Sequence, residues 1–468
     1  LLGLVGSEMC IRDRSYSYQE EDATSTMRDL ISESKSYDRE SKILNAIRVQ
    51  NKALTEDAKF KKYQKMSISP YIFYRGSNHL FWQDFAGSWR LHQFGGASWA
   101  RTWLQGDSHV YNMGAFKHQG EDVCFGFDDF DDSLVADYQY DIWRFTVSVV
   151  LDCWDRHLNN SAEIDRALDA FSSSYLLSFK KTIKAKKLFE KRFTASNTCK
   201  PLSSFLKKTQ GKSSRQKMLE KWTIGKDDRQ FQLNSDKVKA LDTPSRDQLI
   251  DALSNYRENR NELMGQQHSS SPMKILDVVE RLGAGTGSLG NQRFYALIRD
   301  IDQQTEDHDF ILDIKLQGQP TAYEFLSREE TDEYNNNFSS HAIRHAEAYS
   351  ALSDFPDHHL GWINLDNESY SVRERCPYKK DFETSRLSSK EFLQMAEQWG
   401  AVLALKHRRA ARRLNDNQES SLLEEKLKTI ADDHDSEFKF FIRSLAQPYA
   451  QQVRRDWEAF RHNAGTLV

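Results

Sequence analysis

The order of two motifs is the sequence feature that most constrains how this chain folds. The first motif is Gly106–Asn112, and an acidic segment at Phe127–Asp132 follows it. The second is the glycine-rich stretch Gly285–Gly290, followed by a strand-like segment that ends at Lys315. Aspartate with asparagine, and glycines with lysine, are two halves of a site that handles phosphate groups. Because the acidic half comes first, a fold that uses both halves must bring distant segments together.

Composition indicates a folded protein with few specialised features. The chain has 468 residues, of which 38% are hydrophobic and 12% aromatic, which suggests two or three lobes or subdomains. Its net charge is -4, so we expect no nucleic-acid partner. Five scattered cysteines without a Cys-x-x-Cys pair favour a reducing, cytoplasmic compartment over disulfides or a zinc cluster. No apolar run approaches the roughly 20 residues of a membrane helix, so we expect no membrane partner.

Changes in composition divide the chain into segments. Residues 1–14 resemble the translation of a sequencing adapter, and we expect them to lie outside the fold. The basic stretch Lys180–Lys221 is interpreted as a solvated helical face and a linker, because it lacks a regular interleave of aromatic residues. The other expected segments are a helical extension (15–65), a catalytic-loop and metal-binding half (66–160), a helical insert that contains the basic stretch (161–272), a β-rich nucleotide-binding unit (273–380) and closing helices (381–468).

Local patterns predict the main elements. Pro70 should break any helix near it, and Pro448 should interrupt the final helical region Leu422–Phe460. Ser388 and Glu391 form a capping box that begins a helix with one apolar face. Strands are expected at Val123–Phe127, Ile275–Leu282, Arg293–Ile298, Phe310–Lys315 and Ser369–Arg373, and further helices at Ile142–Trp154, Ile164–Phe179 and Ser339–Ser353.

The glycine-rich stretch is a candidate phosphate cradle. Its Gly-x-Gly-Ser-x-Gly pattern is made by Gly285, Gly287, Ser288 and Gly290. A strand-like segment follows it, which favours a kinase-type hairpin over a dinucleotide fold, with a plain glycine turn as the alternative. Lys315 would then contact phosphate groups and pair with a helix glutamate, for which Glu324 and Glu347 are both candidates.

The first motif carries the candidate catalytic and metal-binding groups. Asp107 and Asn112 are five positions apart, which is the spacing of a catalytic aspartate and a metal-binding asparagine in kinases. His109 lies between them and would support the loop, although a packed loop histidine is an equal alternative. Asp129 and Asp131 would bind metal, since crowded carboxylates are costly unless a cation joins them, and a solvated acidic turn is the alternative.

Two further sites extend the pattern. Asp141 and Arg144, on the next predicted helix, are placed to brace the Asp107 loop. Arg75 is a candidate for binding phosphate or the acidic cluster.

The motifs as a set resemble a bacterial family known as domain of unknown function 2252. They are Ser69-Pro70 through Arg75-Gly76, Gly106–Asn112, Asp129-Phe130-Asp131, Asp141 with Arg144, Gly285–Gly290 with Lys315, Leu360-Gly361-Trp362 and Val372-Arg373, and the resemblance covers roughly residues 65–465. The first motif with its acidic turn is also similar to aminoglycoside- and choline-type phosphotransferases. Gln105 stands where those enzymes carry histidine. That similarity implies ATP and Mg²⁺ as cofactors.

These observations together predict an α+β fold that is two-lobed and protein-kinase-like, circularly permuted, with a large helical portion. In such a fold a long helix precedes the catalytic loop, and the segment Glu391–Arg413 has a suitable pattern. We expect it to pack under the Asp107 loop, and we expect Lys315 to lie near Asp129. Chain rearrangement of this kind is tolerated when the new ends fall at the surface.

Three functions are consistent with these residues. The first is an ATP- and Mg²⁺-dependent phosphotransferase that acts on a small-molecule or protein hydroxyl. The second is a metal-dependent phosphoesterase with Asp107, His109, Asp129 and Asp131 around two metals. The third is a non-catalytic nucleotide-binding module. Nucleotide dependence of stability would separate the first from the second.

Overall fold

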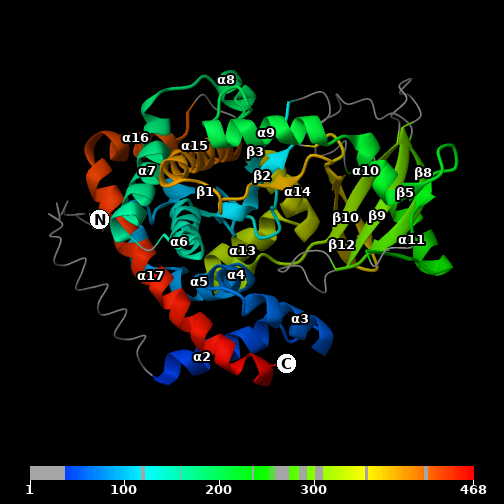
Figure 1. Cartoon of the computed structure of the whole chain (residues 1–468), viewed down its shortest axis with the longest axis horizontal. Helices are drawn as coiled ribbons and strands as arrows, with labels where there is room; N and C mark the ends of the chain where they lie inside the picture. The colour runs from blue at the N-terminus through cyan, green and yellow to red at the C-terminus, as the bar shows by residue number, and fades with distance from the viewer. Residues whose placement is uncertain are drawn as a thin grey trace, which may run out of the picture.

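A mixture of helices and antiparallel sheets builds the molecule, which is an α+β protein (Figure 1). The computed structural model describes residues 37–117, 122–158, 160–233, 237–254, 256, 259, 273–283, 292–300, 309–353, 357–415 and 420–467. Residues 1–14 and the glycine-rich stretch fall outside the described residues. Most helices gather on one side of the molecule and the largest sheet lies on the other (Figure 1). In the described part of the chain, no helix is long and apolar enough to cross a membrane.

The largest sheet has six strands in the order β11-β12-β10-β9-β8-β7, and every neighbouring pair is antiparallel. Its strands are β7 (Val238–Ala240), β8 (Met273–Arg281), β9 (Arg293–Asp300), β10 (Asp309–Leu316), β11 (Gly361–Leu365) and β12 (Glu368–Glu374). The strands expected from the sequence in this region are confirmed. In the register, Lys315 of β10 lies opposite Arg293 of β9 and Ser371 of β12.

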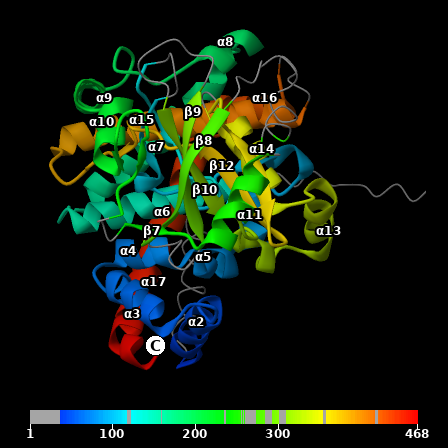
Figure 2. The same cartoon turned by 90° about the vertical axis from the view of Figure 1, so that its right-hand side faces the viewer.

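Both faces of this sheet are apolar because helices cover both (Figure 2). The helix α11 (Thr243–Ser254) packs on the face that carries Phe294, Ala296 and Leu312. The helix α10 (Arg215–Trp222) packs on the face that carries Tyr295 and Ile311. Side chains alternate along a strand, so Lys315 shares the α10 face with Ile311.

A helical connection joins β10 to β11 and leads back to the rest of the molecule. It consists of η4 (Thr321–Phe325), α13 (Arg328–Asn337) and α14 (His341–Leu352). The helix α14 lies against β11 and β12 of the sheet and also against β1 and α15 of the helical side. This helix therefore links the two sides of the molecule.

The helical side surrounds two short sheets, in the orders β1-β4 and β13-β2-β3, while the third short sheet, β5-β6, lies beside β8 of the largest sheet. The strands are β1 (Arg101–Leu104), β2 (Met113–Phe116), β3 (Cys124–Phe127), β4 (Leu134–Asp137), β5 (Thr223–Ile224), β6 (Gln230–Phe231) and β13 (Lys380–Asp381). The helices are α2 (Tyr37–Gln50), α3 (Glu56–Met66), α4 (Pro70–Gly76), α5 (Asn78–Phe85), η1 (Trp89–Gln93), η2 (Ser98–Ala100), η3 (Val110–Asn112), α6 (Gln139–Asp155), α7 (Ser161–Lys180), α8 (Ala185–Glu190), α9 (Lys200–Lys212), α15 (Ser389–Leu414), α16 (Leu422–Asp433), α17 (Asp435–Asn463) and η5 (Ala464–Thr466).

The helix α15 is the central element of this side. Its capping box at Ser388 and Glu391 is present, as the sequence predicted. It packs along α7 and also against β1, the strand that leads into the Asp107 loop. A Cβ placed on Gly400 would overlap the carbonyl oxygen of Phe171 in α7, so the close approach of these helices requires glycine.

Two proline predictions were wrong. Pro70 does not break a helix but begins α4, with Ser69 as the N-cap. A backbone N–H in the first turn of a helix has no acceptor within the helix, so its absence in proline costs no hydrogen bond. The fixed φ of proline also suits that position. Pro448 lies inside α17, and the break in the final helical region falls at His434 instead. A proline is tolerated within a long helix when packing elsewhere holds the helix together.

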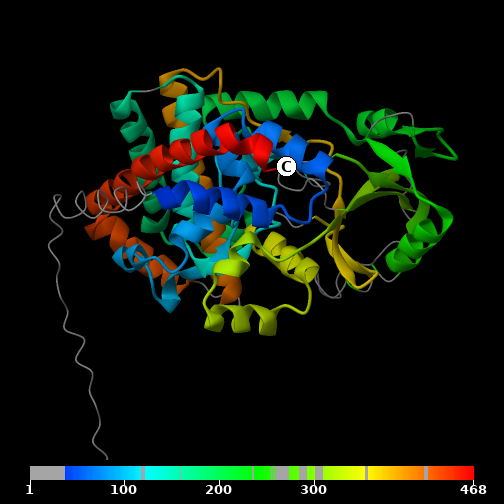
Figure 3. The ribbon, with the colours of Figure 1, turned by 90° about the horizontal axis from the view of Figure 1, so that it is seen from below.

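The basic stretch is also more ordered than a linker. It forms α8, α9 and α10, and three apolar residues of α10 pack on the sheet: Met218, Leu219 and Trp222. The expected extension at 15–65 contains α2 and α3, and α2 lies beside α17 (Figure 3). Ile43 and Ile47 of α2 are fully buried, so α2 is part of the core.

Candidate functional site

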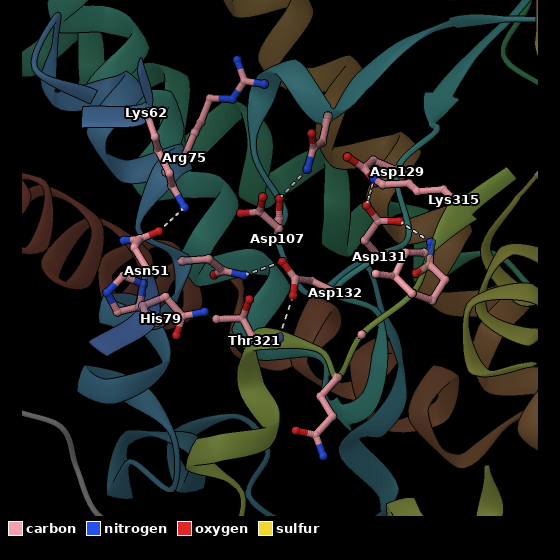
Figure 4. A pocket seen from close by; sticks show the side chains of 18 of the residues that line it. Asn51, Lys62, Arg75, His79, Asp107, Asp129, Asp131, Asp132, Lys315 and Thr321 are labelled. Atoms are coloured by element: carbon pink, nitrogen blue, oxygen red, sulfur yellow. Dashed lines mark hydrogen bonds and ion pairs between the residues drawn. The ribbon is translucent and has the colours of Figure 1, made fainter. Parts of the chain in front are cut away.

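Residues of the first motif and of its acidic turn lie with Lys315 around one cavity of about 440 Å³ (Figure 4). Asp107, Asp129 and Lys315 all line it, although Lys315 lies about two hundred positions along the chain from Asp107. The loop before β2, the turn after β3 and the end of β10 therefore converge, as we expected from the sequence. Residues of α3, α4 and α5 complete the wall.

Glycine at position 106 allows the Asp107 loop to approach the acidic turn. Gly106 has a φ of 82°, and a Cβ there would overlap the carbonyl oxygen of Asp132. The Gly106 carbonyl accepts hydrogen bonds from Asn78 Nδ2 and Trp82 Nε1, each at 3.2 Å. The backbone on both sides of the cavity is thus fixed by contacts between α5, the loop and the turn.

Asp141 braces the same loop from below, as the sequence predicted. Its carboxylate accepts hydrogen bonds from the backbone amides of Gln105 at 2.8 Å and Gly106 at 3.0 Å. Asp141 is 1% exposed, and His407 Nε2 of α15 lies 3.3 Å from it. The expected packing of the Glu391–Arg413 segment under the Asp107 loop is therefore present, through His407.

Gln105 ties the loop to the acidic turn. Its Nε2 donates to the backbone oxygen of Asp129 at 2.7 Å, and its Oε1 accepts from the amide of Asp107 at 3.0 Å. One amide side chain thus holds the backbones of both candidate aspartates.

Asp107 forms an ion pair with Arg144 of α6, whose Nε lies 2.7 Å from Asp107 Oδ1. The guanidinium also lies over the ring of Tyr74, with its central carbon 4.3 Å from the ring centroid. Burial raises the pKa of Asp107 to about 7, and Arg144 opposes that rise. A carboxylate with such a pKa is suited to accept a proton near neutral pH.

His109 and Asn112 both support the loop. His109 is 1% exposed, its Nδ1 lies 3.4 Å from Tyr71 Oη, and its Nε2 lies 3.7 Å from Asp107 Oδ2. Burial lowers the pKa of His109 well below its usual range, so the imidazole is neutral at pH 7. Asn112 Nδ2 donates to the Asp107 carbonyl at 2.8 Å, and no hydrogen bond to the Asn112 side-chain oxygen is found among the described residues.

Three carboxylates of the acidic turn form ion pairs or hydrogen bonds with other residues of the chain. Asp128 pairs with Lys379 at 3.1 Å, and Asp131 pairs with Lys315 and accepts from Gln317 at 3.0 Å. Asp132 accepts from the backbone amide of Thr321 at 2.6 Å and from Asn78 at 3.1 Å. The sequence predicted a metal ion at this cluster. In the structure Lys379 pairs with Asp128 and Lys315 pairs with Asp131, and metal binding stays a prediction.

Asp129 differs from its neighbours. No side-chain hydrogen bond or ion pair of Asp129 is found with the described residues, and its pKa is raised by burial and by the charge of Asp131. It lines the cavity together with Asn112 and Asp131. Within the described residues, no group of three His, Cys, Asp or Glu side chains is arranged to hold a metal.

Lys315 is partnered by Asp131, and not by a glutamate, in the described part of the chain. Glu324 and Glu347, the two candidates from the sequence, are both exposed. Gly285, Gly287, Ser288 and Gly290 lie outside the described residues, so their relation to Lys315 stays a prediction. Arg75 lines the cavity on the opposite side of Asp107 from Lys315 (Figure 4).

Arg344 of α14 holds the acidic turn, and sequence reasoning missed it. It is fully buried, and it donates to the backbone oxygens of Ser133 at 2.6 Å, Asp131 at 2.7 Å and Gly318 at 3.3 Å. Arg373 of β12 adds a hydrogen bond to the Asp128 carbonyl at 2.9 Å. No local pattern marks Arg344, whereas Arg373 belongs to the Val-Arg pair noted in the sequence.

A second cavity, of about 680 Å³, lies on the other side of Lys315 and Asp129, which line both cavities. The sheet contributes Arg293 and Tyr295, and α10 contributes Trp222. Many of its lining residues are basic: Lys212, Lys217, Lys221, Arg281, Arg293, Lys315, Arg373, Arg375 and Lys379. Part of the basic stretch therefore faces this cavity.

A family model described as an uncharacterised protein conserved in bacteria, DUF2252, matches residues 54–463. The chain belongs to this family. The match extends from just before α3 to the end of α17, so nearly all of the site lies within it. No curated protein and no solved structure matches the chain. Membership in DUF2252 is what the motif set suggested, and the activity of the chain has to be argued from the site.

Proposed function

We propose that this protein is an ATP- and Mg²⁺-dependent phosphotransferase on a circularly permuted, two-lobed, kinase-like scaffold. The observation that carries the proposal is that Asp107, Asp129 and Lys315 line one cavity. Phosphoryl transfer needs a carboxylate that orients the acceptor, metal ligands and a cation at the phosphates. These three side chains supply one group for each need.

The order of elements supports the scaffold. The hairpin β8–β9 flanks the glycine-rich stretch, β10 carries Lys315, and the helix α14 follows. In protein kinases a glycine loop, a lysine strand and a helix occur in this order. The helix α15 packs on β1, the strand that leads into the Asp107 loop, although α15 comes long after this loop in the sequence. Such a juxtaposition is what a permuted chain would require.

The side chains fit a magnesium ion. Asn112 offers an amide oxygen, and Asp129 is a half-buried carboxylate that forms no ion pair with the described residues. Oxygen ligands of this kind suit Mg²⁺, which would neutralise charge on the transferred phosphoryl group. Asp131 would join them only by releasing Lys315, which would then be available to the phosphates.

The nucleotide fits the second cavity best. It lies beside Lys315 and Asp129, and many of its lining residues are cations. Arginine and lysine bind phosphate oxygens. The acceptor would enter from the first cavity, where the Asp107 carboxylate is placed to accept the proton of a hydroxyl group.

The ion pairs favour this function over a two-metal phosphoesterase. Asp107 is held by Arg144 and Asp131 by Lys315, so two of the four residues proposed for that site are neutralised by fixed cations. His109 is buried beside Asp107 and donates to or accepts from Tyr71. A non-catalytic module would need no carboxylate with a pKa near neutrality, such as Asp107.

Thermal unfolding of the whole chain across nucleotides and metals tests the proposal. ATP with Mg²⁺ should raise the midpoint by about 3–5 °C at saturating concentrations. Lys315→Ala and Asp129→Asn should each abolish most of the shift, while Lys274→Ala, an exposed lysine of β8, should leave it unchanged. If no nucleotide raises the midpoint, the proposal fails, and stabilisation by Mn²⁺ alone would favour a phosphoesterase.

A further inference from the structure

A buried lysine without an anionic partner lies in the wall of the first cavity. Lys62 of α3 is 7% exposed, and its Nζ donates to Asn51 Oδ1 at 2.7 Å. No carboxylate lies within ion-pair distance of it in the described part of the chain. A buried ammonium group is costly unless it is paired or binds an anion. The fold therefore maintains an uncompensated positive charge at this point.

One polar neighbour of Lys62 also has an unpartnered ring nitrogen among the described residues. His79 of α5 is 3% exposed and lines the same cavity, and its Nε2 has no hydrogen-bond partner among the described residues. Burial and the charge of Lys62 lower the pKa of His79 to about 3, so this imidazole is neutral. A neutral imidazole can donate a hydrogen bond to an anion without adding to the charge of the wall.

Lys62 and Arg75 lie on one side of Asp107, and Lys315 with Asp131 lies on the other (Figure 4). Arg75 is exposed and makes no hydrogen bond or ion pair with the described residues. Asp132, the carboxylate whose charge acts on Lys62, is already held by Thr321 and Asn78. The side of the cavity away from the nucleotide is thus the cationic side.

We propose that the acceptor is a small molecule that carries both a hydroxyl group and an anionic group, either a carboxylate or a phosphate. This inference rests on the proposed phosphotransferase function. The anionic group would bind Lys62, His79 and Arg75, and the hydroxyl would face Asp107. A cavity of about 440 Å³ is of the size that small-molecule ligands occupy. The same cations would repel aminoglycosides and choline, the acceptors of aminoglycoside- and choline-type phosphotransferases, because those acceptors are cationic.

The reaction balances with ATP as the only co-reactant. The acceptor oxygen forms a bond to the γ-phosphorus, and the bond between that phosphorus and the β,γ-bridging oxygen breaks. The bond electrons leave with ADP, and the hydroxyl proton passes to Asp107. Lys62 would bind the anionic group of the acceptor while the hydroxyl reacts.

The test measures thermal unfolding of the whole chain with four probes at equal ionic strength: gluconate, glycerol 3-phosphate, sorbitol and choline. Gluconate or glycerol 3-phosphate should raise the midpoint by about 2–4 °C, and sorbitol and choline should not. A shift with gluconate alone identifies a carboxylate, and one with glycerol 3-phosphate alone identifies a phosphate. The inference is overturned if neither anion shifts the midpoint, or if sorbitol or choline shifts it as much.

Variants assign the effect to the cavity. Lys62→Met and the exposed Arg75→Gln should each remove at least half of the shift caused by the anion, while Lys65→Met, on the exposed side of α3, should retain it. Retention of the shift in both cavity variants overturns the inference.

A parallel titration with ATP and Mg²⁺ separates this inference from the proposed function. If Lys62→Met binds the nucleotide normally and loses the anion shift, both stand. If nucleotide binds but no anion does, only the acceptor class is wrong. If Lys62→Met abolishes nucleotide binding, Lys62 belongs to the nucleotide site and the inference falls. If anions bind through Lys62 but no nucleotide binds, the proposed function fails and the acceptor role fails with it.

Discussion

At the scale of single residues, Asp107 experiences two opposing effects on its charge. Burial raises its pKa to about 7, and the Arg144 guanidinium opposes the rise. The phosphotransfer rate at limiting acceptor should therefore increase with pH and level off above about pH 7. Replacing Arg144 with Met removes the cation that favours the carboxylate. The rising limb of the pH profile, which is the range where the rate increases with pH, should therefore move to higher pH.

Arg144→Lys keeps the charge and should leave the limb closer to that of the wild type. Arg101→Met, which removes an arginine from an ion pair with Glu333, is the control and should not move it. The measurement is kcat/KM as a function of pH for the four proteins. An unchanged limb in Arg144→Met would show that Asp107 is not the titrating group.

Lys62 gives a second residue-scale prediction, on stability. Burial lowers its pKa from 10.5 to about 8, so the fold disfavours the protonated form. The folded state binds fewer protons than the unfolded state between these pKa values, and stability rises with pH across that range. The full cost is present below pH 8. Lys62→Met should therefore raise the free energy of unfolding at pH 7 by about 1–3 kcal/mol.

Urea unfolding of the ligand-free protein at pH 7 and at pH 10 checks this expectation. The advantage of Lys62→Met should shrink at pH 10, where wild-type Lys62 is neutral in the fold. Lys65→Met should change the free energy by less than about 0.5 kcal/mol at either pH. A destabilised Lys62→Met would mean that the lysine is structural and would remove a reason to see it as a ligand-binding group.

At the scale of elements, the contact between α15 and α7 leaves no room for a side chain at position 400. A Cβ on Gly400 would overlap the Phe171 carbonyl oxygen and lie 3.0 Å from the Tyr175 amide nitrogen. Gly400→Ala should lower the free energy of unfolding by about 2–4 kcal/mol, because backbone cannot yield as a side chain does. Gly211→Ala in α9 meets no atom within 4 Å and should be neutral or stabilising by about 0.5–1 kcal/mol. Chemical denaturation of both variants makes the comparison, and equal effects would contradict the close approach.

The sequence predicted elements better than it predicted contacts between them. The strands β8, β9, β10 and β12 follow from β-branched and aromatic runs, and the cap of α15 follows from Ser388 and Glu391. The proline errors arose because a local rule was applied without knowing whether each proline lies at a helix start or within a well-packed helix.

The motif residues of the site were identifiable because their types and spacings are chemically distinctive. Arg344 and Lys62 were not, since their importance depends on partners more than two hundred positions away or on burial against other elements. The partner of Lys315 was missed for a related reason. A helix glutamate was expected by analogy with protein kinases, but Lys315 forms its ion pair with Asp131 of the acidic turn.

At the scale of the whole molecule, the two ends of the described chain lie side by side. The helix α2 packs along α17, and Asn463 Nδ2 donates to Glu40 Oε1 at 3.0 Å (Figure 3). A rearranged gene that joins Leu467 to Tyr37 through a short glycine–serine linker, and that opens the chain between Asn259 and Met273, should fold. This chain would begin with β8, so the lysine strand would precede the Asp107 loop.

The rearranged protein should unfold within a few degrees of the natural one and keep the shift caused by ATP with Mg²⁺. Circular dichroism on heating, with and without nucleotide, measures both. A chain that folds but no longer responds to nucleotide would show that the natural order of segments matters for the site.

The contact between Gly106 and the Asp132 carbonyl sets a limit on how this protein can diverge. The separation of the Asp107 loop from the acidic turn is set at a point where only a hydrogen atom fits. Most cavity residues could change in step with a new acceptor, because each contributes a separate contact. Position 106 has no such freedom, since any side chain would push the segments apart whatever the substrate. In a saturation library selected for activity, this position should retain glycine alone, even among variants that have acquired a different acceptor.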